Sequence, residues 1–124
     1  MTATKNLEIN QGSTFKYDFI FEQENDSTKV YDPIDLTNSI VRMQIRPNHH
    51  SSEIILDLTE DGYIYISDPA NGVVTINIPK SITTGLNFVD GVYDIELAFD
   101  ATPEEDNVIR IVEGKVKLSL EVTR

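Results

Sequence analysis

Apolar and polar residues alternate with a period of two along most of the chain. From Phe15 to Glu22 the odd positions are aromatic and the even positions are mostly polar. Such alternation predicts strands that bury one face. The same pattern recurs over 7–9, 41–46, 53–59, 63–66, 74–78, 93–99 and 109–122.

Turn and breaker residues separate these strands. Asp68-Pro69-Ala70-Asn71-Gly72 is the strongest turn, because Pro presets φ and Asn-Gly tolerates positive φ. Only 80–87 predicts a helix, of one or two turns, with Ser81 as its cap and Gly85 as its breaker. Gly114 divides two in-phase apolar runs, which predicts a bulge or bend within one long final strand.

These strands and turns define the expected fold. Eight or nine short strands in 124 residues are typical of a sandwich or barrel. We expect an all-β fold, a single antiparallel β-sandwich of immunoglobulin-like type, forming one domain over residues 1–124. Residues 23–33 and 100–107 are predicted to be its longest loops, and both are acidic.

Charge and composition exclude several classes of function. The chain has 10 Lys and Arg against 21 Asp and Glu, a formal net charge of −11. This balance argues against binding to nucleic acid and to anionic membranes, which both need clustered basic residues. No cysteine is present, which excludes disulfides and thiolate chemistry. We find no targeting signal and expect synthesis in a reducing bacterial cytoplasm.

Candidate chemistry is sparse. His49 and His50 are adjacent, so on an extended chain they point apart and do not favour a shared metal. No nucleophile elbow and no glycine-rich phosphate loop occur. The acidic segments 57–61 and 100–106 have oxygen ligands of the kind calcium prefers, but not the spacing of an EF-hand. We therefore expect no enzyme activity, no catalytic residues, no cofactor and no metal site.

Interaction surfaces are the remaining candidates. Tyr31, Tyr63 and Tyr65 are the tyrosines that we expect to have exposed rings. Tyr63 and Tyr65 share a face opposite Ile64 and Ile66, so this strand has two apolar faces and is a candidate interface or glycan platform. A core role is the alternative interpretation.

The last strand is the second candidate interface. Its apolar positions alternate up to the last residue, and the interface set that they predict is Val116, Leu118, Leu120, Val122 and Arg124. Such a strand is either central in its sheet, which is the default, or an edge that accepts a strand from a neighbour.

Several segments resemble a family in sequence and order. They are Gly12-Ser13-Thr14-Phe15, Pro33-Ile34-Asp35-Leu36-Thr37, Val41 to Arg46, Asn71-Gly72, Tyr93-Asp94-Ile95-Glu96-Leu97, Gly114-Lys115-Val116 and Glu121 to Arg124. The chain resembles small β-sandwich virion proteins of tailed bacteriophages, and is similar to the N-terminal domains of baseplate upper proteins. One departure is the longer acidic insert from Glu22 to Lys29.

The resemblance implies a function without an active site. It implies a virion structural protein of the tail, baseplate or adjoining neck, which acts as an assembly or adaptor module. Its partners would be other virion proteins of the tail, baseplate, fibre or neck, and it would be present in several copies in a symmetric particle. Alternatives are a head–tail connector, a capsid decoration protein, or a receptor- or glycan-binding β-module.

Overall fold

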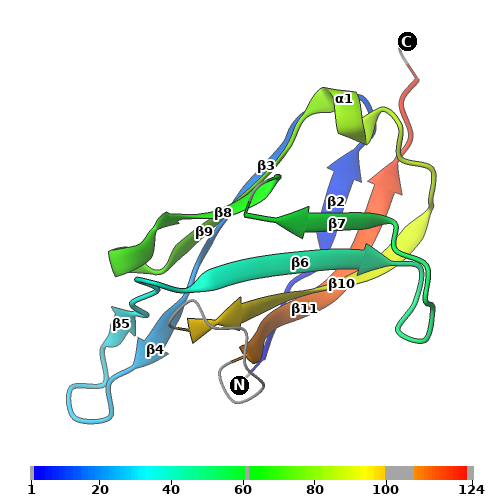
Figure 1. Ribbon diagram of the computed structural model, residues 1–124. Helices are drawn as coiled ribbons and strands as arrows, with labels where there is room; N and C mark the ends of the chain where they lie inside the picture. Colours follow the sequence, from blue (N-terminus) through cyan, green and yellow to red (C-terminus); the bar gives the residue numbers. More distant parts are fainter. Residues whose placement is uncertain (1, 61, 100–107, 123–124) are drawn as a thin grey trace.

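The computed structural model describes residues 2–60, 62–99 and 108–122. Within them nearly all of the regular secondary structure is β-strand, with two short helical turns (Figure 1). The strands are β1 (Ala3–Thr4), β2 (Leu7–Asn10), β3 (Phe15–Ile20), β4 (Glu22–Glu24), β5 (Tyr31–Pro33), β6 (Ile40–Arg46), β7 (Leu56–Thr59), β8 (Ile64–Asp68), β9 (Val73–Ile78), β10 (Asp90–Ala98) and β11 (Val108–Ser119). The helical turns are η1 (Pro69–Asn71) and α1 (Lys80–Thr83). The prediction of an all-β fold is confirmed, with more strands than expected because several are only two to four residues long.

The strands form three sheets. The largest has the order β1-β11-β10-β6-β7, and β2 also pairs with β11. The second sheet has the order β3-β9-β8, and β4 with β5 forms a separate hairpin. Both β1 and β2 run parallel to β11, so the prediction of purely antiparallel pairing is wrong. Alternation shows which face of a strand is buried and leaves its direction open.

The two larger sheets share one hydrophobic core. Its side chains run from Leu7 in β2 to Leu118 in β11 and come from both sheets. In β3 the predicted alternation is confirmed, since Phe19 is buried whereas Lys16 and Asp18 are exposed. Phe19 and Phe21 stack with ring centroids 5.8 Å apart. The aromatic face of β3 therefore packs into the core, as its period of two predicts.

The predicted turn at 68–72 agrees with the structure, whereas the predicted helix is shorter than expected and has a different N-cap. Gly72 follows η1 with a φ of 70°, as the Asn-Gly turn predicts. The helix α1 spans only Lys80–Thr83, and Pro79 occupies its N-cap, so Ser81 as the cap is wrong. Proline fits the start of a helix because it lacks the N–H that would remain unpaired there.

The long last strand is irregular, but the irregularity is not at Gly114. The register with β10 shifts between Ile95 and Glu96, which leaves Ile111 as the extra residue of a bulge. Gly114 stays in register opposite Tyr93. A Cβ at Gly114 would collide with the carbonyl of Lys5, so this glycine allows the N-terminal segment to approach closely.

Candidate protein-interaction site

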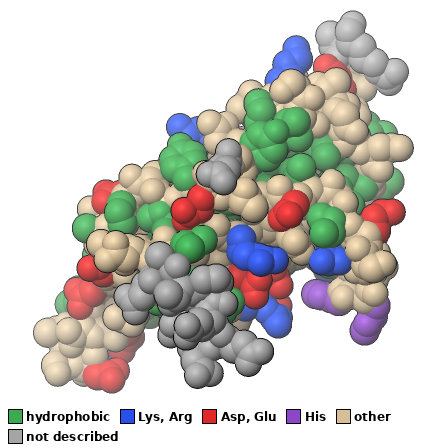
Figure 2. Space-filling model, viewed as in Figure 1, with side chains coloured by type: hydrophobic (Ala, Val, Ile, Leu, Met, Phe, Trp, Pro, Cys, Tyr) green, Lys and Arg blue, Asp and Glu red, His purple; other side chains and the backbone are tan. Residues whose placement is uncertain are grey.

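A projecting hairpin, β4–β5, occupies the stretch that we predicted to be a loop. It extends from the end of the molecule opposite α1 (Figure 1). All six residues of its strands are exposed. The segment from Glu22 to Asp35 has five acidic residues and one lysine, and acidic side chains gather over this end (Figure 2). The hairpin is therefore a fully exposed and acidic paired element of the described chain.

The base of the hairpin is fixed to the body by backbone hydrogen bonds. Phe21 donates its N–H to the Gly72 carbonyl and accepts from the Ile34 N–H, both at 2.9 Å. Leu36, which is buried, donates to the Pro69 carbonyl at 2.8 Å. A Cβ on Gly72 would collide with the carbonyls of Phe21 and Ile34, so glycine is needed here. The hairpin thus leaves the body at a defined position.

The motif Pro33 to Thr37 forms the turn that follows the hairpin. Asp35 accepts hydrogen bonds from the Thr37 hydroxyl at 2.5 Å and from the Thr37 N–H at 2.9 Å. These bonds, the hydroxyl first, hold the pKa of the Asp35 carboxyl below its ordinary value. The conformation is a side-chain turn that orients Leu36 toward the core. This motif is therefore structural.

An apolar groove lies between the hairpin and the beginning of β11. It has a volume of about 570 Å³ and is lined by Phe21, Ile34, Phe99, Ile109, Ile111, Ala3, Tyr31 and the three residues of β4. Tyr31 is 61% exposed and Ile109 is 44% exposed, so much of this apolar lining is accessible. Glu22 and Glu24 form an acidic rim along one side. A groove with an apolar floor and an acidic rim fits an apolar segment with basic flanks.

The tyrosines of the predicted interface lie on different sides. Tyr63 precedes β8 with a φ of 78° and packs, half-buried, against the core. Tyr65 is 41% exposed, whereas Ile64 is fully buried. The prediction that Tyr63 and Tyr65 share an exposed face is therefore wrong, because the left-handed backbone at Tyr63 interrupts the alternation.

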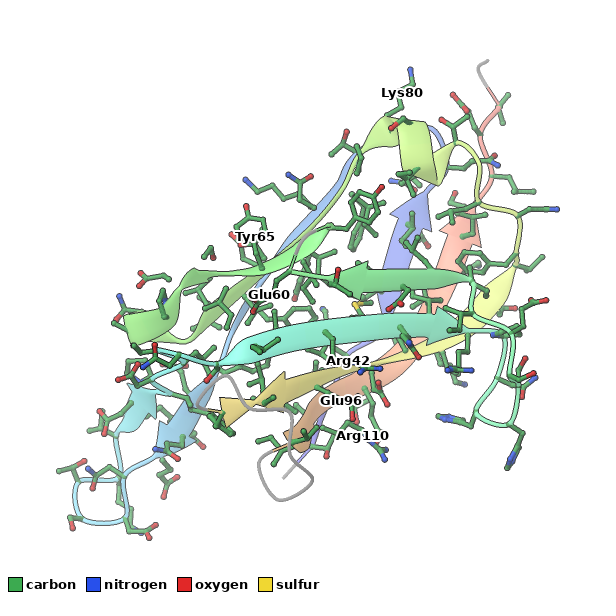
Figure 3. The ribbon with its side chains drawn as sticks, in the orientation of Figure 1. Arg42, Glu60, Tyr65, Lys80, Glu96 and Arg110 are labelled. Carbon is green, nitrogen blue, oxygen red and sulfur yellow. The ribbon has the colours of Figure 1, made fainter. Side chains whose placement is uncertain are left out.

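Tyr65 borders a shallow pocket with polar groups. Asn38, Ser39 and Glu60 also line it, and Figure 3 shows Glu60 beside Tyr65. Glu60 accepts a hydrogen bond from the Val41 N–H at 2.9 Å. The buried hydroxyl oxygen of Ser39 has no hydrogen-bond partner in the described part of the protein.

The predicted interface in the last strand separates into core and tail. Val116 and Leu118 are buried, and β11 is hydrogen-bonded to β10 on one side and to β1 and β2 on the other. The central position is the default that we stated, and strand addition to this part of β11 is excluded because both of its edges are paired. We therefore expect truncation after Gly114 to unfold the chain.

The strand ends earlier than predicted. It stops at Ser119, and Leu120 and Val122 beyond it are 65% and 92% exposed. Arg124 lies outside the described residues. Leu120 and Val122 thus remain accessible apolar residues. The end of β11 that precedes them lies far from the hairpin (Figure 1).

The outer face of the largest sheet carries paired charges. Arg42 lies 3.6 Å from Glu96, and Arg110 lies 3.7 Å from Asp94 and 3.3 Å from Glu113. Figure 3 shows Arg42, Glu96 and Arg110 near one another on β6, β10 and β11. These ion pairs are exposed and each contributes little stability, but they leave this face close to neutral. The unpaired acidic character therefore lies mainly elsewhere, including the hairpin.

Beneath this face, Tyr93 fastens the N-terminal segment. Its hydroxyl donates to the Lys5 carbonyl at 2.6 Å. Burial, and to a lesser extent the neighbouring Tyr17, raises the pKa of Tyr93 well above its ordinary value. Tyr93 is structural because its hydroxyl has no exposed position from which to act on a ligand.

The structure brings together no metal site among the residues it describes. No group of three or more His, Asp or Glu side chains there is placed to hold an ion. His49 and His50 are exposed in the turn after β6. The acidic loop 100–107 and Asp61 of the segment 57–61 lie outside the described residues. No described helix is long and apolar enough to cross a membrane.

The hairpin groove is a site that sequence reasoning missed. Tyr31 was expected to be exposed, and the acidic insert was visible, but nothing joined them to Ile109 and Ile111. The groove depends on the contact between segments about 80 residues apart. The only available signal was an exposed tyrosine inside the acidic stretch.

Comparisons with known proteins add little to this geometry. No protein-family model and no curated protein matches the chain. One similar solved structure is a chain from work titled "Structural basis of T cell specificity and activation by the bacterial superantigen toxic shock syndrome toxin-1". The likeness covers 92% of each chain with 9% sequence identity and a TM-score of 0.49.

Proposed function

We propose that this chain is a non-enzymatic structural component of a tailed-bacteriophage virion, in the tail, baseplate or adjoining neck. It acts as an assembly module that joins other virion proteins. One observation carries the proposal: a firmly anchored acidic hairpin projects from the body and borders an accessible apolar groove. Large exposed apolar surfaces that adjoin polar rims are typical of protein–protein interfaces.

An immunoglobulin-like sandwich is part of this proposal. The order β3-β9-β8 is the order of strands B, E and D in one sheet of such folds. The order β6-β10-β11 is that of strands C, F and G in the other sheet. The pairing of β7 with β6 corresponds to the extra strand of the variable type. The common core from Leu7 to Leu118 supports one domain. Such folds serve many functions, so the assignment of function rests on the hairpin site and on the resemblance of the motifs.

The proposal is tested on intact particles. An antibody against this chain, imaged by negative-stain electron microscopy, should label particles of the encoding phage at the tail, baseplate or neck. Labelling spread over the capsid surface would instead support the decoration alternative. A chain found only in the soluble fraction of infected cells would overturn the virion proposal.

Glycan binding is a second candidate because of the pocket at Tyr65. An exposed ring beside Asn38 and Glu60 has the apolar plane and polar edge that sugar recognition uses. A glycan array should then give signals that Tyr65→Ala abolishes while its unfolding midpoint stays near that of the wild type. Tyr63→Ala is unsuitable for this test because Tyr63 packs against the core.

A further inference from the structure

The groove beside the hairpin follows a strand edge. Glu22, Gln23 and Glu24 all line it, although successive side chains of a strand point to opposite sides. Three consecutive lining residues mean that the groove reaches the backbone of β4 as well as its side chains. The backbone of β4 is therefore accessible from the groove.

The hydrogen-bond phase of the hairpin shows which backbone groups face outward. Phe21 accepts from Ile34, and Asn25 donates to the Val30 carbonyl at 2.8 Å. Backbone groups of an antiparallel strand point alternately to its two sides, so Phe21, Gln23 and Asn25 face β5. Glu22 and Glu24 consequently direct their N–H and C=O groups away from β5. No other described strand pairs with this edge of β4.

The opposite edge of the hairpin is protected. Pro33 pairs with Glu22 and therefore also faces outward, on the far side of β5. Proline has no N–H to donate, and it is one of the devices by which sheets prevent unwanted strand pairing. The hairpin thus has one edge closed by proline and, beside an apolar groove, one edge that no strand of the described residues pairs with.

We propose that an extended segment of a partner protein binds here by adding a strand to the edge of β4. The occupant has alternating residues: apolar side chains enter the groove, and Lys or Arg side chains meet Glu22 and Glu24. Charge complementarity identifies it, because the segment from Glu22 to Asp35 has five acidic residues against one lysine. Lys29 lies 3.8 Å from Glu24 and is largely exposed, so a ligand cation can replace it. This inference rests on the proposed role as an interaction module.

Strand addition explains why the site needs both the edge and the groove. Main-chain hydrogen bonds to Glu22 and Glu24 give affinity without sequence preference. The apolar lining from Phe21, Ile34 and Ile111 then selects the side chains of one face of the added strand. The acidic rim increases the association rate and rejects acidic segments.

The inference is tested with a ten-residue peptide of alternating Leu and Lys, added to the full chain. A peptide of alternating Leu and Glu is its control. We expect the lysine peptide to bind and to change the NMR chemical shifts of Glu22, Glu24, Tyr31 and Ile109. Its affinity should fall as the salt concentration rises. The Glu peptide should not bind.

Two variants separate the contributions of charge and edge. The double variant Glu22→Lys, Glu24→Lys should weaken binding of the lysine peptide about five- to tenfold. The control double variant Glu8→Lys, Glu53→Lys changes two exposed sites outside the groove and should alter the affinity less than twofold. Glu24→Pro removes one outward N–H and keeps the bonds to β5, so it should weaken binding about fivefold. Unchanged one-dimensional NMR dispersion of each variant shows that its fold is retained.

The outcomes have distinct meanings. Strand addition at β4 is overturned if the peptide changes the NMR shifts of other strand edges instead, or if Glu24→Pro leaves its affinity unchanged. Particle labelling can still support the virion role in either case. Concentration-dependent self-association that Glu24→Pro abolishes would assign the edge to a second copy and overturn the basic partner. Peptide binding at β4 without particle labelling would keep this inference and overturn the virion role.

Discussion

The body of the protein and its β4–β5 hairpin both consist of hydrogen-bonded strands, but the body strands bury one face and the hairpin strands bury none. In the body, strands such as β6 and β10 bury alternate side chains completely, as at Val41, Ile45 and Ile95. In the hairpin every strand residue is exposed, and the pairing is held by its anchored base. A single hairpin without a buried face is marginal by itself, so its position depends on the body. Changes in the body should therefore alter stability, and changes in the hairpin should alter binding.

The largest expected effect is in the body. Ile95 is fully buried in β10 and pairs with Val112 and Met43. Ile95→Ala should lower the free energy of unfolding by about 2–5 kcal/mol, because it removes apolar contacts and leaves a cavity. Denaturant unfolding measures this change. A loss below about 1 kcal/mol would show that the core is not continuous at this position.

The next effect concerns the close approach of the N-terminal segment. Gly114→Ala should cost about 1–3 kcal/mol, because the new methyl group collides with the Lys5 carbonyl. Gly62→Ala is the matched control, since a Cβ there meets nothing within 4 Å. Thermal unfolding of both variants compares them. Equal midpoints would contradict the close packing of β1 and β2 on β11.

A smaller, pH-dependent effect is expected at Tyr93. Tyr93→Phe should cost about 1 kcal/mol at neutral pH through loss of the hydrogen bond to Lys5. Because burial raises the pKa of Tyr93, its contribution is complete below the ordinary tyrosine value of about 10 and declines as pH rises beyond it. The stability difference between wild type and variant should therefore shrink at alkaline pH. A constant difference up to pH 11 would contradict the raised pKa.

The smallest effect on stability is expected in the hairpin. Tyr31→Ala should change the free energy of unfolding by less than about 0.5 kcal/mol, because the side chain is mostly exposed. The same variant should lower the affinity for the lysine peptide several-fold. Calorimetric unfolding and peptide titration on one sample measure both. A large loss of stability would mean that the hairpin is part of the body.

Sequence reasoning was accurate where one face of a strand is buried. It predicted a strand with one buried face over 41–46, and β6 spans Ile40–Arg46 with Val41, Met43 and Ile45 buried, because burial of one face imposes a period of two. It failed where distant contacts decide. The sequence predicts a bulge or bend at Gly114, whereas this glycine makes room for the carbonyl of Lys5. Local sequence does not reveal this contact, because Lys5 is more than 100 positions away.

The candidate site was less predictable than the fold. Glu22-Gln23-Glu24 has no apolar alternation, so a strand was not expected there. The predicted interface residues Val116 and Leu118 are core, since the alternation that marks an interface strand also marks a buried one. Which edges of a strand are free depends on sheet order, and the period of the sequence leaves that order open.

Backbone hydrogen exchange at β4 tests the central claim most directly. In the free chain we predict fast exchange of the Glu22 and Glu24 amides and slower exchange of the Gln23 amide, which faces β5. Addition of the lysine peptide should slow exchange at Glu22 and Glu24 and leave Gln23 nearly unchanged. Glu22 and Glu24 amides that exchange as fast with the bound peptide as without it would contradict strand addition at this edge.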